Sequence, residues 1–440
     1  MIQQTQDRTG RQEKAENLYY DQLRTGKKGG TFVACTGFGK TRVAMNIMKK
    51  YRKKHPLREI IVVVPSNQIL SQWETLAREN GIGLVSVKTI QSISLQENNY
   101  VCGFLIIDEV HWAGAEQFCR VFKYVGYDLL LCLTATLERN DGKEKIISDL
   151  APVFDTIGIA EARRSGWVAD HYQYALKVKM DSQARKQYDE CTKTIDSLFT
   201  YFNHDYQSSR DCLSLWGARN YVRDNNFAGD PGSTLDQKAK EYQGMAGNLA
   251  RNFQLRRELV YNDQSKINAA AMLVEALQMK TVTFSETIAC AENVAKKLVL
   301  KKVSAAPYYS GMAYAPELDG PKKLSKKKVA EGRMCAFVGG SFQVLTTAKA
   351  LNEGMDVPGI QLGVIVSGTG TERTQKQRMG RVIRKESDKV SIIVNIVLAD
   401  TVDERWLESR SGNMGVRRFS DFGLMIEDIQ EKTGNLTDTP

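Results

Sequence analysis

Residues 31–51 join an apolar run, "TFVA", to a glycine-containing loop, "CTGFGKT", and then to the amphipathic pattern "RVAMNIMKKY". A strand that enters a helix through such a loop is typical of a phosphate-binding site, because glycines let backbone N–H groups approach phosphate oxygens and the helix N-terminus is electropositive. The alternative is a chance glycine-rich turn, which would need neither the strand before it nor the helix after it. The segment therefore predicts an ATP site, formed by Thr36, Gly37, Phe38, Gly39, Lys40 and Thr41.

Two residues at the end of this loop carry its expected chemistry. We expect the Lys40 ammonium to reach the β and γ phosphates and the Thr41 hydroxyl to ligate Mg²⁺. The stretch "LIIDEVH" (residues 105–111) then supplies two acids at the end of an apolar strand. An isolated pair of acids would simply be solvated, but beside a phosphate loop Asp108 would hold Mg²⁺ and Glu109 would activate a water in line with the γ-phosphate.

Short apolar runs alternate with helical patterns over residues 31–159 and again over residues 280–404. Such alternation predicts parallel sheets flanked by helices, and hence an α/β fold with two domains. We place the first domain at residues 1–165, the second at 166–412 and a frayed C-terminal tail at 413–440. A mostly helical insertion is expected at about 180–270, inside the second domain.

The insertion contains Trp216 with several arginines nearby. This tryptophan is expected to pack in a helical core, and the alternative is that it stacks on or wedges between nucleic-acid bases.

Composition limits the class of protein. The chain has 440 residues and a formal net charge of +10, which favours a polyanionic partner. Its 8 cysteines form no CxxC pair, so they indicate buried thiols in a reducing compartment rather than a zinc site. The sequence contains no apolar run long enough to span a bilayer, and we expect a cytoplasmic protein.

The motifs of this chain resemble, in order, those of the superfamily 2 DExH-box helicases and translocases, a family of two RecA-like domains. "DEVH" is similar to their second motif. The pattern "LTATLERNDG" and the segments around "QRMGRVIR" are closest to the group that contains XPB, RadD-like and UvsW-like proteins, although Leu137 stands where that group usually has proline. The other matching segments are "VVVPSNQILSQW" (62–73), "KTIQSI" (88–93), "TFSET" (283–287) and "VLTTAKALNEGMDVP" (344–358).

The resemblance implies roles for further residues. Arg381 and Arg384 would cross from the second domain to the γ-phosphate, with Gln377 contacting that phosphate or its water. Asp356 would contact the nucleotide or these arginines.

Gln12 is similar to the glutamine that recognises adenine in many relatives, although a helix-surface position or a role for Arg8 is an open alternative. His111 would link the second motif to Thr134 and Thr136, or to Gln377.

The resemblance also implies a nucleic-acid face that contacts the sugar-phosphate backbone of one strand and is largely indifferent to sequence. Its members would be Ser66, Gln68, Thr89, Gln91, Ser285, Thr346 and Thr347. The expected substrate is forked or branched DNA. An RNA helicase is the alternative, because backbone contacts discriminate the sugar poorly, and a non-catalytic nucleic-acid scaffold is a further one. The segments "VLTTAKALNEGMDVP" and "QRMGRVIR" are too close together in the sequence to enclose a strand-separating hairpin. The helical insertion is therefore the first candidate for a strand-separating wedge.

Overall fold

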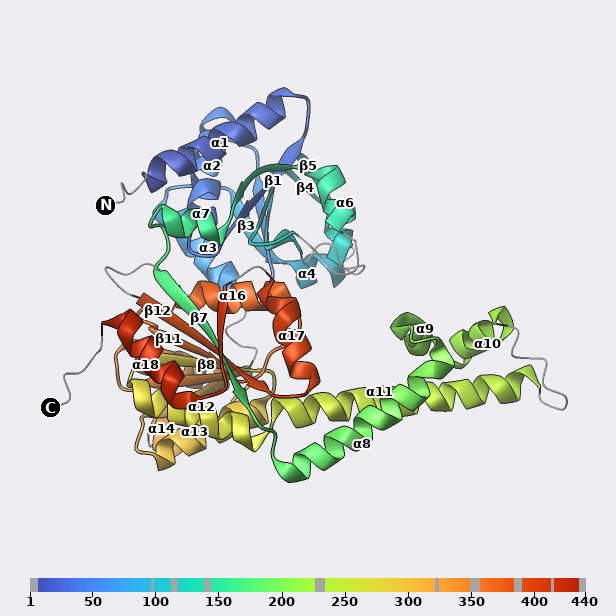
Figure 1. Cartoon of the computed structure of the whole chain (residues 1–440). Coiled ribbons are helices and arrows are strands. Elements are labelled where there is room, and N and C mark those ends of the chain that lie inside the picture. Colours follow the sequence, from blue (N-terminus) through green and yellow to red (C-terminus); the bar gives the residue numbers. More distant parts are fainter. Residues whose placement is uncertain are drawn as a thin grey trace.

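The computed structural model describes residues 7–95, 99–111, 118–137, 144–225, 234–320, 324–348, 357–383, 390–412 and 415–434. Figure 1 shows two α/β domains, one above the other, and a long helical arm that projects from the lower one. A membrane-crossing helix would need a long apolar stretch, and no helix within the described ranges has one.

The first domain is built on a six-stranded sheet of order β3-β2-β4-β5-β1-β6, in which every pairing is parallel. Its central strand β2 is apolar and buried along its whole length because helices cover both faces. The elements are α1 (Arg8–Arg24), β1 (Gly29–Ala34), α2 (Lys40–Lys54), β2 (Ile60–Val64), α3 (Asn67–Glu79), β3 (Val85–Thr89), α4 (Ile90–Leu95), β4 (Tyr100–Asp108), α5 (Val121–Tyr124), β5 (Val125–Thr134), α6 (Glu144–Leu150), β6 (Val153–Ile157) and α7 (Ile159–Arg164).

The second domain contains a seven-stranded parallel sheet of order β13-β7-β12-β11-β8-β10-β9. Its elements outside the arm are β7 (Asp170–Val178), α12 (Gln264–Leu277), β8 (Thr281–Ser285), α13 (Ile288–Leu300), β9 (Ala305–Tyr309), α14 (Pro316–Asp319), α15 (Lys326–Val338), β10 (Val344–Ala348), β11 (Leu362–Ile365), α16 (Glu372–Val382), β12 (Val390–Leu398), α17 (Val402–Ser411), β13 (Val416–Phe419) and α18 (Phe422–Thr433). One apolar cluster contains side chains of both domains, among them Phe38 beside the phosphate loop and Met379 on α16. The two domains therefore share buried surface.

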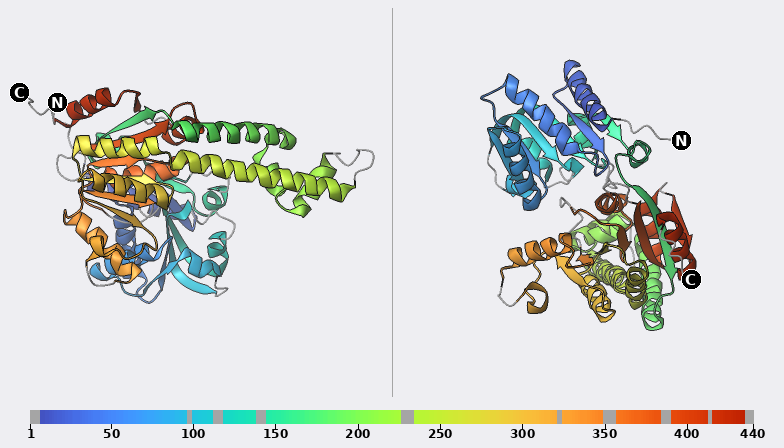
Figure 2. Two further views of the ribbon diagram at one scale, coloured as in Figure 1. Left: turned by 90° about the horizontal axis from the view of Figure 1, so that it is seen from below. Right: turned by 90° about the vertical axis from the view of Figure 1, so that its left-hand side faces the viewer.

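The arm consists of α8 (Ser182–Phe199), α9 (Tyr206–Asp211), α10 (Leu215–Asp224) and α11 (Leu235–Tyr261). Figure 1 and the left view of Figure 2 show α8 and α11 running side by side away from the second domain, with the short helices near the far end. At the base of the arm, Tyr188 and Val260 pack with Leu398 and Val402 of the second domain. The Tyr188 hydroxyl also accepts a hydrogen bond from the Val402 backbone N–H at 2.7 Å. The arm is thus firmly attached at one end only.

Two expectations about the second domain need correction. The segment after residue 413 is not only a frayed tail, because β13 pairs in parallel with β7 and α18 buries Met425 and Ile429 against the domain. Trp216 is 76% exposed on α10 and does not pack in a helical core. Small residues occupy the inward positions of α10 instead, including Gly217 and Ala218.

Candidate nucleotide site between the two domains

The phosphate loop follows β1 and ends at the first turn of α2. Gly37 and Gly39 have φ angles of 89° and 105°, a region that side chains rarely adopt, so these glycines are required by the backbone. The Lys40 ammonium donates to the Ala34 carbonyl at 3.1 Å and lies 3.9 Å from a carboxylate oxygen of Glu109. Half-buried Thr41 stands in the same turn of α2. The loop thus places Lys40 between the phosphate-binding backbone and the acids of β4.

Side chains of helix α1 form hydrogen bonds with the backbone of the phosphate loop. The side-chain amide of Gln12, which is 2% exposed, donates to the Phe38 carbonyl at 3.0 Å. Arg8 donates to the same carbonyl at 2.9 Å and also to that of Gly37. Gln12 is therefore a buried support of the loop and not a helix-surface residue, while its contact with adenine stays a prediction. From the sequence, Arg8 is only an alternative to Gln12 for recognising adenine. Nothing in the sequence indicates that both residues contact the same carbonyl.

Asp108 ends β4, and the chain turns sharply at Glu109 directly after it. The Trp73 indole N–H donates to Asp108 Oδ2 at 2.9 Å and fixes that carboxylate. Glu109 has a φ of 50°, which costs a non-glycine residue on the order of 1 kcal/mol or more and is found mostly at functional sites. In the sequence, Trp73 is simply the last residue of the motif "VVVPSNQILSQW". Its contact with Asp108 could not be inferred from that position.

The two acids differ in their electrostatic environment. Burial, together with the charge of Glu109, raises the pKa of Asp108 to about 6. Burial also opposes the charge of Glu109, but Lys40, His111 and Arg381 outweigh that effect and lower the pKa of Glu109 to about 2. Glu109 is therefore held as a carboxylate, the form in which it can accept a proton.

His111 lies where the sequence predicted a link to "LTAT". Its Nδ1 is 3.3 Å from Glu109 Oε2 and 3.1 Å from the Thr134 hydroxyl. That hydroxyl donates to the Thr136 carbonyl at 2.6 Å and accepts from the Thr136 N–H at 3.2 Å. A continuous polar chain thus runs from Glu109 to the end of β5, and the transmission of the nucleotide state along it remains a prediction.

Helix α16 of the second domain lies directly against the phosphate loop. A Cβ atom added to Gly380 would lie 2.2 Å from the Cβ of Thr36, so the absence of a side chain permits this contact. Gln377 and Arg381 on the same helix are 8% and 7% exposed. After Lys40 and His111, the charge of Arg381 also contributes to the lowered pKa of Glu109. Arg384 and Asp356 lie outside the described residues.

Replacing Gly380 by alanine tests whether this contact is needed for turnover. Each ~1.4 kcal/mol added to the cost of bringing α16 onto the loop lowers the rate tenfold, and we expect kcat to fall by at least about tenfold. Gly332→Ala on α15 is the matched control, because a Cβ atom there meets nothing within 4 Å. Steady-state ATPase assays and thermal melting of both variants would check this; equal kcat values for the two would show that the contact is dispensable.

The residues assigned to the nucleic-acid face do not share one environment. Gln91 is exposed and remains available to a ligand. The Ser66 hydroxyl, at the N-cap of α3, is buried and makes no hydrogen bond to a described residue. The Thr89 hydroxyl is already used, since it accepts from the Ser92 N–H at 3.2 Å and caps α4. The side chain of Gln68 lies outside the described residues.

Three members of that face are placed differently from the expectation. Ser285, Thr346 and Thr347 are 0–1% exposed, and the Thr347 hydroxyl donates to the Thr283 carbonyl at 2.9 Å inside the sheet. Their side chains therefore do not line a surface in this structure, and their contact with nucleic acid stays a prediction. The physical reason is that β8 and β10 are central strands covered on both faces.

Comparisons with known proteins agree with this geometry. The type III restriction enzyme res subunit family matches residues 7–82, and the helicase conserved C-terminal domain matches residues 265–386. The DNA 3'-5' translocase XPB2 of Sulfurisphaera tokodaii is 27% identical over 395 residues, which are 86% of this chain and 80% of that protein. The DNA 3'-5' helicase XPB of Mycobacterium tuberculosis is 28% identical over 122 residues, covering 27% of this chain and 21% of that one.

The solved structure of Saccharomyces cerevisiae Dbp5 bound to RNA and ADP BeF3 has the same fold. It superposes with a TM-score of 0.55 at 14% identity, covering 92% of this chain and 89% of that one. The two parallel sheets and their helices are thus RecA-like domains. Family matches in both halves and a translocase relative that spans most of the chain support a superfamily 2 helicase related to XPB, and hence an ATP-hydrolysing enzyme.

Proposed function

We propose that the chain is a Mg²⁺-dependent DNA helicase or translocase that unwinds or branch-migrates forked or branched DNA in replication, recombination or repair. The observation that carries the motor part is the contact of α16 with the phosphate loop, because this helix of one domain carries Gln377 and Arg381 and its Gly380 lies against Thr36 of the other. Closure that depends on a γ-phosphate, followed by opening after its loss, would convert hydrolysis into movement between the domains.

The residues present fit the expected ion. The Thr41 hydroxyl and the Asp108 carboxylate offer hard oxygen ligands, which Mg²⁺ prefers, and Trp73 already orients the carboxylate. When bound there with ATP, Mg²⁺ would supply charge neutralisation on the phosphates. Glu109 would accept a proton from the attacking water, and Arg381 would stabilise charge that develops on the transferred phosphate.

The relatives favour DNA over RNA. Two of them are named as DNA translocase or helicase, and one of these spans most of the chain. An RNA helicase is the second candidate, because a putative ATP-dependent RNA helicase of Acanthamoeba polyphaga mimivirus is 29% identical over 138 residues. A non-catalytic scaffold is disfavoured, since Lys40, Glu109 and Arg381 are all in place.

ATPase assays with several activators test the substrate class. We expect forked DNA to stimulate turnover more than single-stranded DNA, and RNA to stimulate it least. Strong stimulation by RNA alone would overturn the DNA assignment and favour the second candidate.

The arm supports a role at a junction. Exposed Trp216 lies near its far end, while Arg219 and Arg223 pair with Asp236 and Asp224 at 2.9 Å and 3.1 Å. Both pairs are exposed, so they are weak and can exchange for phosphate contacts. Stacking of the exposed indole on a base is the contribution we assign to α10.

We expect Trp216→Ala to slow unwinding of a fork by roughly fivefold or more, since a base stacked on an aromatic ring is worth about 1–3 kcal/mol. ATPase activity stimulated by single-stranded DNA should change little. Leu213→Ala is the control, because Leu213 is 45% exposed and lines the same surface pocket as Trp216. Fork unwinding and ATPase rates are measured in parallel for both variants. Equal unwinding rates for Trp216→Ala and Leu213→Ala would show that the indole does not stack on a base during unwinding.

A further inference from the structure

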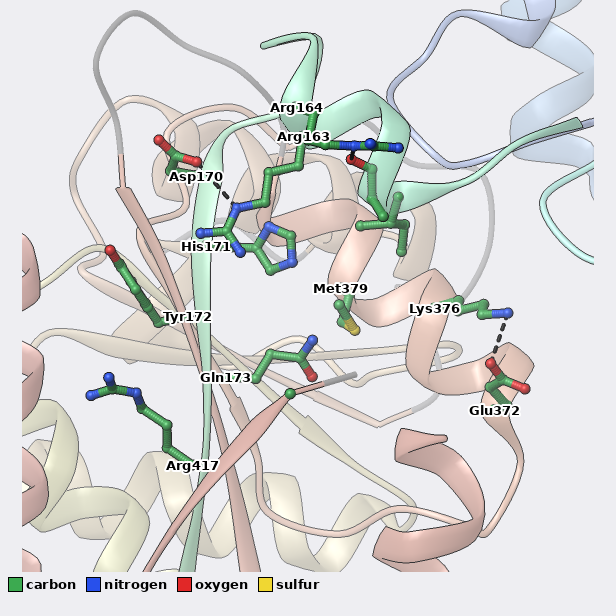
Figure 3. Close-up of a pocket in the computed structure, with 13 residues that line it drawn as sticks. Arg163, Arg164, Asp170, His171, Tyr172, Gln173, Glu372, Lys376, Met379 and Arg417 are labelled. Atoms are coloured by element: carbon green, nitrogen blue, oxygen red, sulfur yellow. Dashed lines mark hydrogen bonds and ion pairs between the residues drawn. The ribbon is translucent and has the colours of Figure 1, made fainter. Parts of the chain in front are cut away.

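A polar pocket of about 750 Å³ lies where the chain passes from the first domain to the second (Figure 3). Helix α7 of the first domain forms one wall, and the start of β7 and helix α16 of the second form the others. Its size is within the range that binds small molecules. None of the phosphate-loop residues lines it.

One wall of the pocket contains a buried side-chain amide whose oxygen accepts no hydrogen bond from a described residue. Gln173 is 7% exposed, and its Oε1 has no hydrogen-bond partner among the described residues. In Figure 3 its side chain points from β7 toward Met379 and Lys376 of α16. A buried polar atom of this kind costs about 1–3 kcal/mol unless it is hydrogen-bonded. Oε1 itself has almost no accessible surface, so the amide must rotate before a ligand can donate to it.

The charged side chains at the rim can be redirected toward an anion. Arg163 pairs with Asp170 at 3.2 Å and Lys376 with Glu372 at 2.8 Å, and each of these pairs is substantially exposed. Exposed pairs contribute only about 0–1 kcal/mol and exchange readily for another partner. Arg164 donates to the Ala160 carbonyl of its own helix at 3.4 Å and has no carboxylate partner within the described ranges.

We propose that this pocket binds a small phosphorylated molecule of about nucleotide size, separately from the ATP held by the phosphate loop. Arg163, Arg164 and Lys376 hold its phosphate oxygens, because guanidinium and ammonium groups form strong charge-assisted hydrogen bonds with them. Gln173 accepts a hydrogen bond from its polar end once the amide has rotated toward the pocket.

Such a ligand would act on both domains at once. Arg163 and Arg164 belong to α7, whereas Lys376 lies one helical turn before Gly380, which touches Thr36 of the phosphate loop. A molecule that fills the space between α7 and α16 therefore binds best at one domain spacing and favours that spacing. A nucleic-acid backbone is the less favoured occupant, because the pocket lies at the amino end of β7, whereas Ser285 of the expected nucleic-acid face ends β8.

Calorimetric titration of inorganic pyrophosphate into the full chain, saturated with a non-hydrolysable ATP analogue, tests the proposal. The analogue fills the phosphate loop, so we expect one pyrophosphate to bind per chain at the pocket. Arg164→Glu should weaken this binding at least about tenfold, the loss typical of a charge-assisted contact. Arg24→Glu is the control for net charge, since that side chain is 78% exposed on α1.

Three results would overturn the proposal. Pyrophosphate binding that disappears when the analogue is present would make the pocket part of the ATP site. Equal weakening by Arg164→Glu and Arg24→Glu, with unchanged thermal melting, would show non-specific attraction. Displacement of pyrophosphate by duplex DNA, with DNA binding also weakened by Arg164→Glu, would assign the pocket to nucleic acid.

Discussion

Glu109→Gln is expected to lower the ATP turnover number by about 10²–10⁴ while ATP still binds, as is typical when a general base is lost. The amide has nearly the same shape, so the strained backbone at this position and the contacts around it are preserved. What is lost is the proton acceptor, which Lys40, His111 and Arg381 hold in its ionised form. Steady-state hydrolysis and binding of a fluorescent ATP analogue measure the two effects separately.

Glu74→Gln is the matched control for this change, because it makes the same substitution at an exposed position on α3. It should leave turnover unchanged. Retained hydrolysis by Glu109→Gln would remove Glu109 from the role of general base.

Arg381→Ala is expected to lower kcat by about 10³ or more, the range seen when a transition-state arginine is removed. The side chain is 7% exposed on the helix of the second domain that lies against the phosphate loop, so its removal would leave the developing charge without its partner. Arg381→Lys should recover little of the loss, because an ammonium cannot replace a planar guanidinium with its fixed donors.

The kinetic constants decide what Arg381 does. A raised KM with normal kcat would indicate a simple binding contact instead of transition-state stabilisation. Arg405→Ala on α17 removes an exposed arginine of the same domain and serves as the control.

Much of the fold could be predicted because the central strands are buried on both faces and therefore appear as continuous apolar runs. Strands β2 and β12 are of this kind. Strand β7 carries His171 and Gln173 at buried positions and lies near the edge of its sheet, so its sequence gave no comparable signal. Strand β13 has only four residues, which is too short for a recognisable alternation.

The candidate site was predictable where its residues are close in sequence or belong to one motif. The phosphate loop, the acids of β4 and the contact of His111 with Thr134 all lie within the first domain. The contact of Gly380 with Thr36 joins two domains, and the burial of Thr346 depends on which strands flank β10. Such facts follow from tertiary packing, which the order of residues alone does not reveal. A cytoplasmic location stays a prediction.

The central claim is that ATP hydrolysis between the two domains drives movement on branched DNA. It is tested most directly by ATP-dependent unwinding of fork, Holliday-type, D-loop and plain-tailed DNA, with Glu109→Gln as the inactive reference. We predict that forked or branched substrates are unwound fastest, only with ATP, and not by Glu109→Gln. Absence of ATP-dependent unwinding or branch migration on every DNA substrate, in a protein that hydrolyses ATP, would contradict the claim.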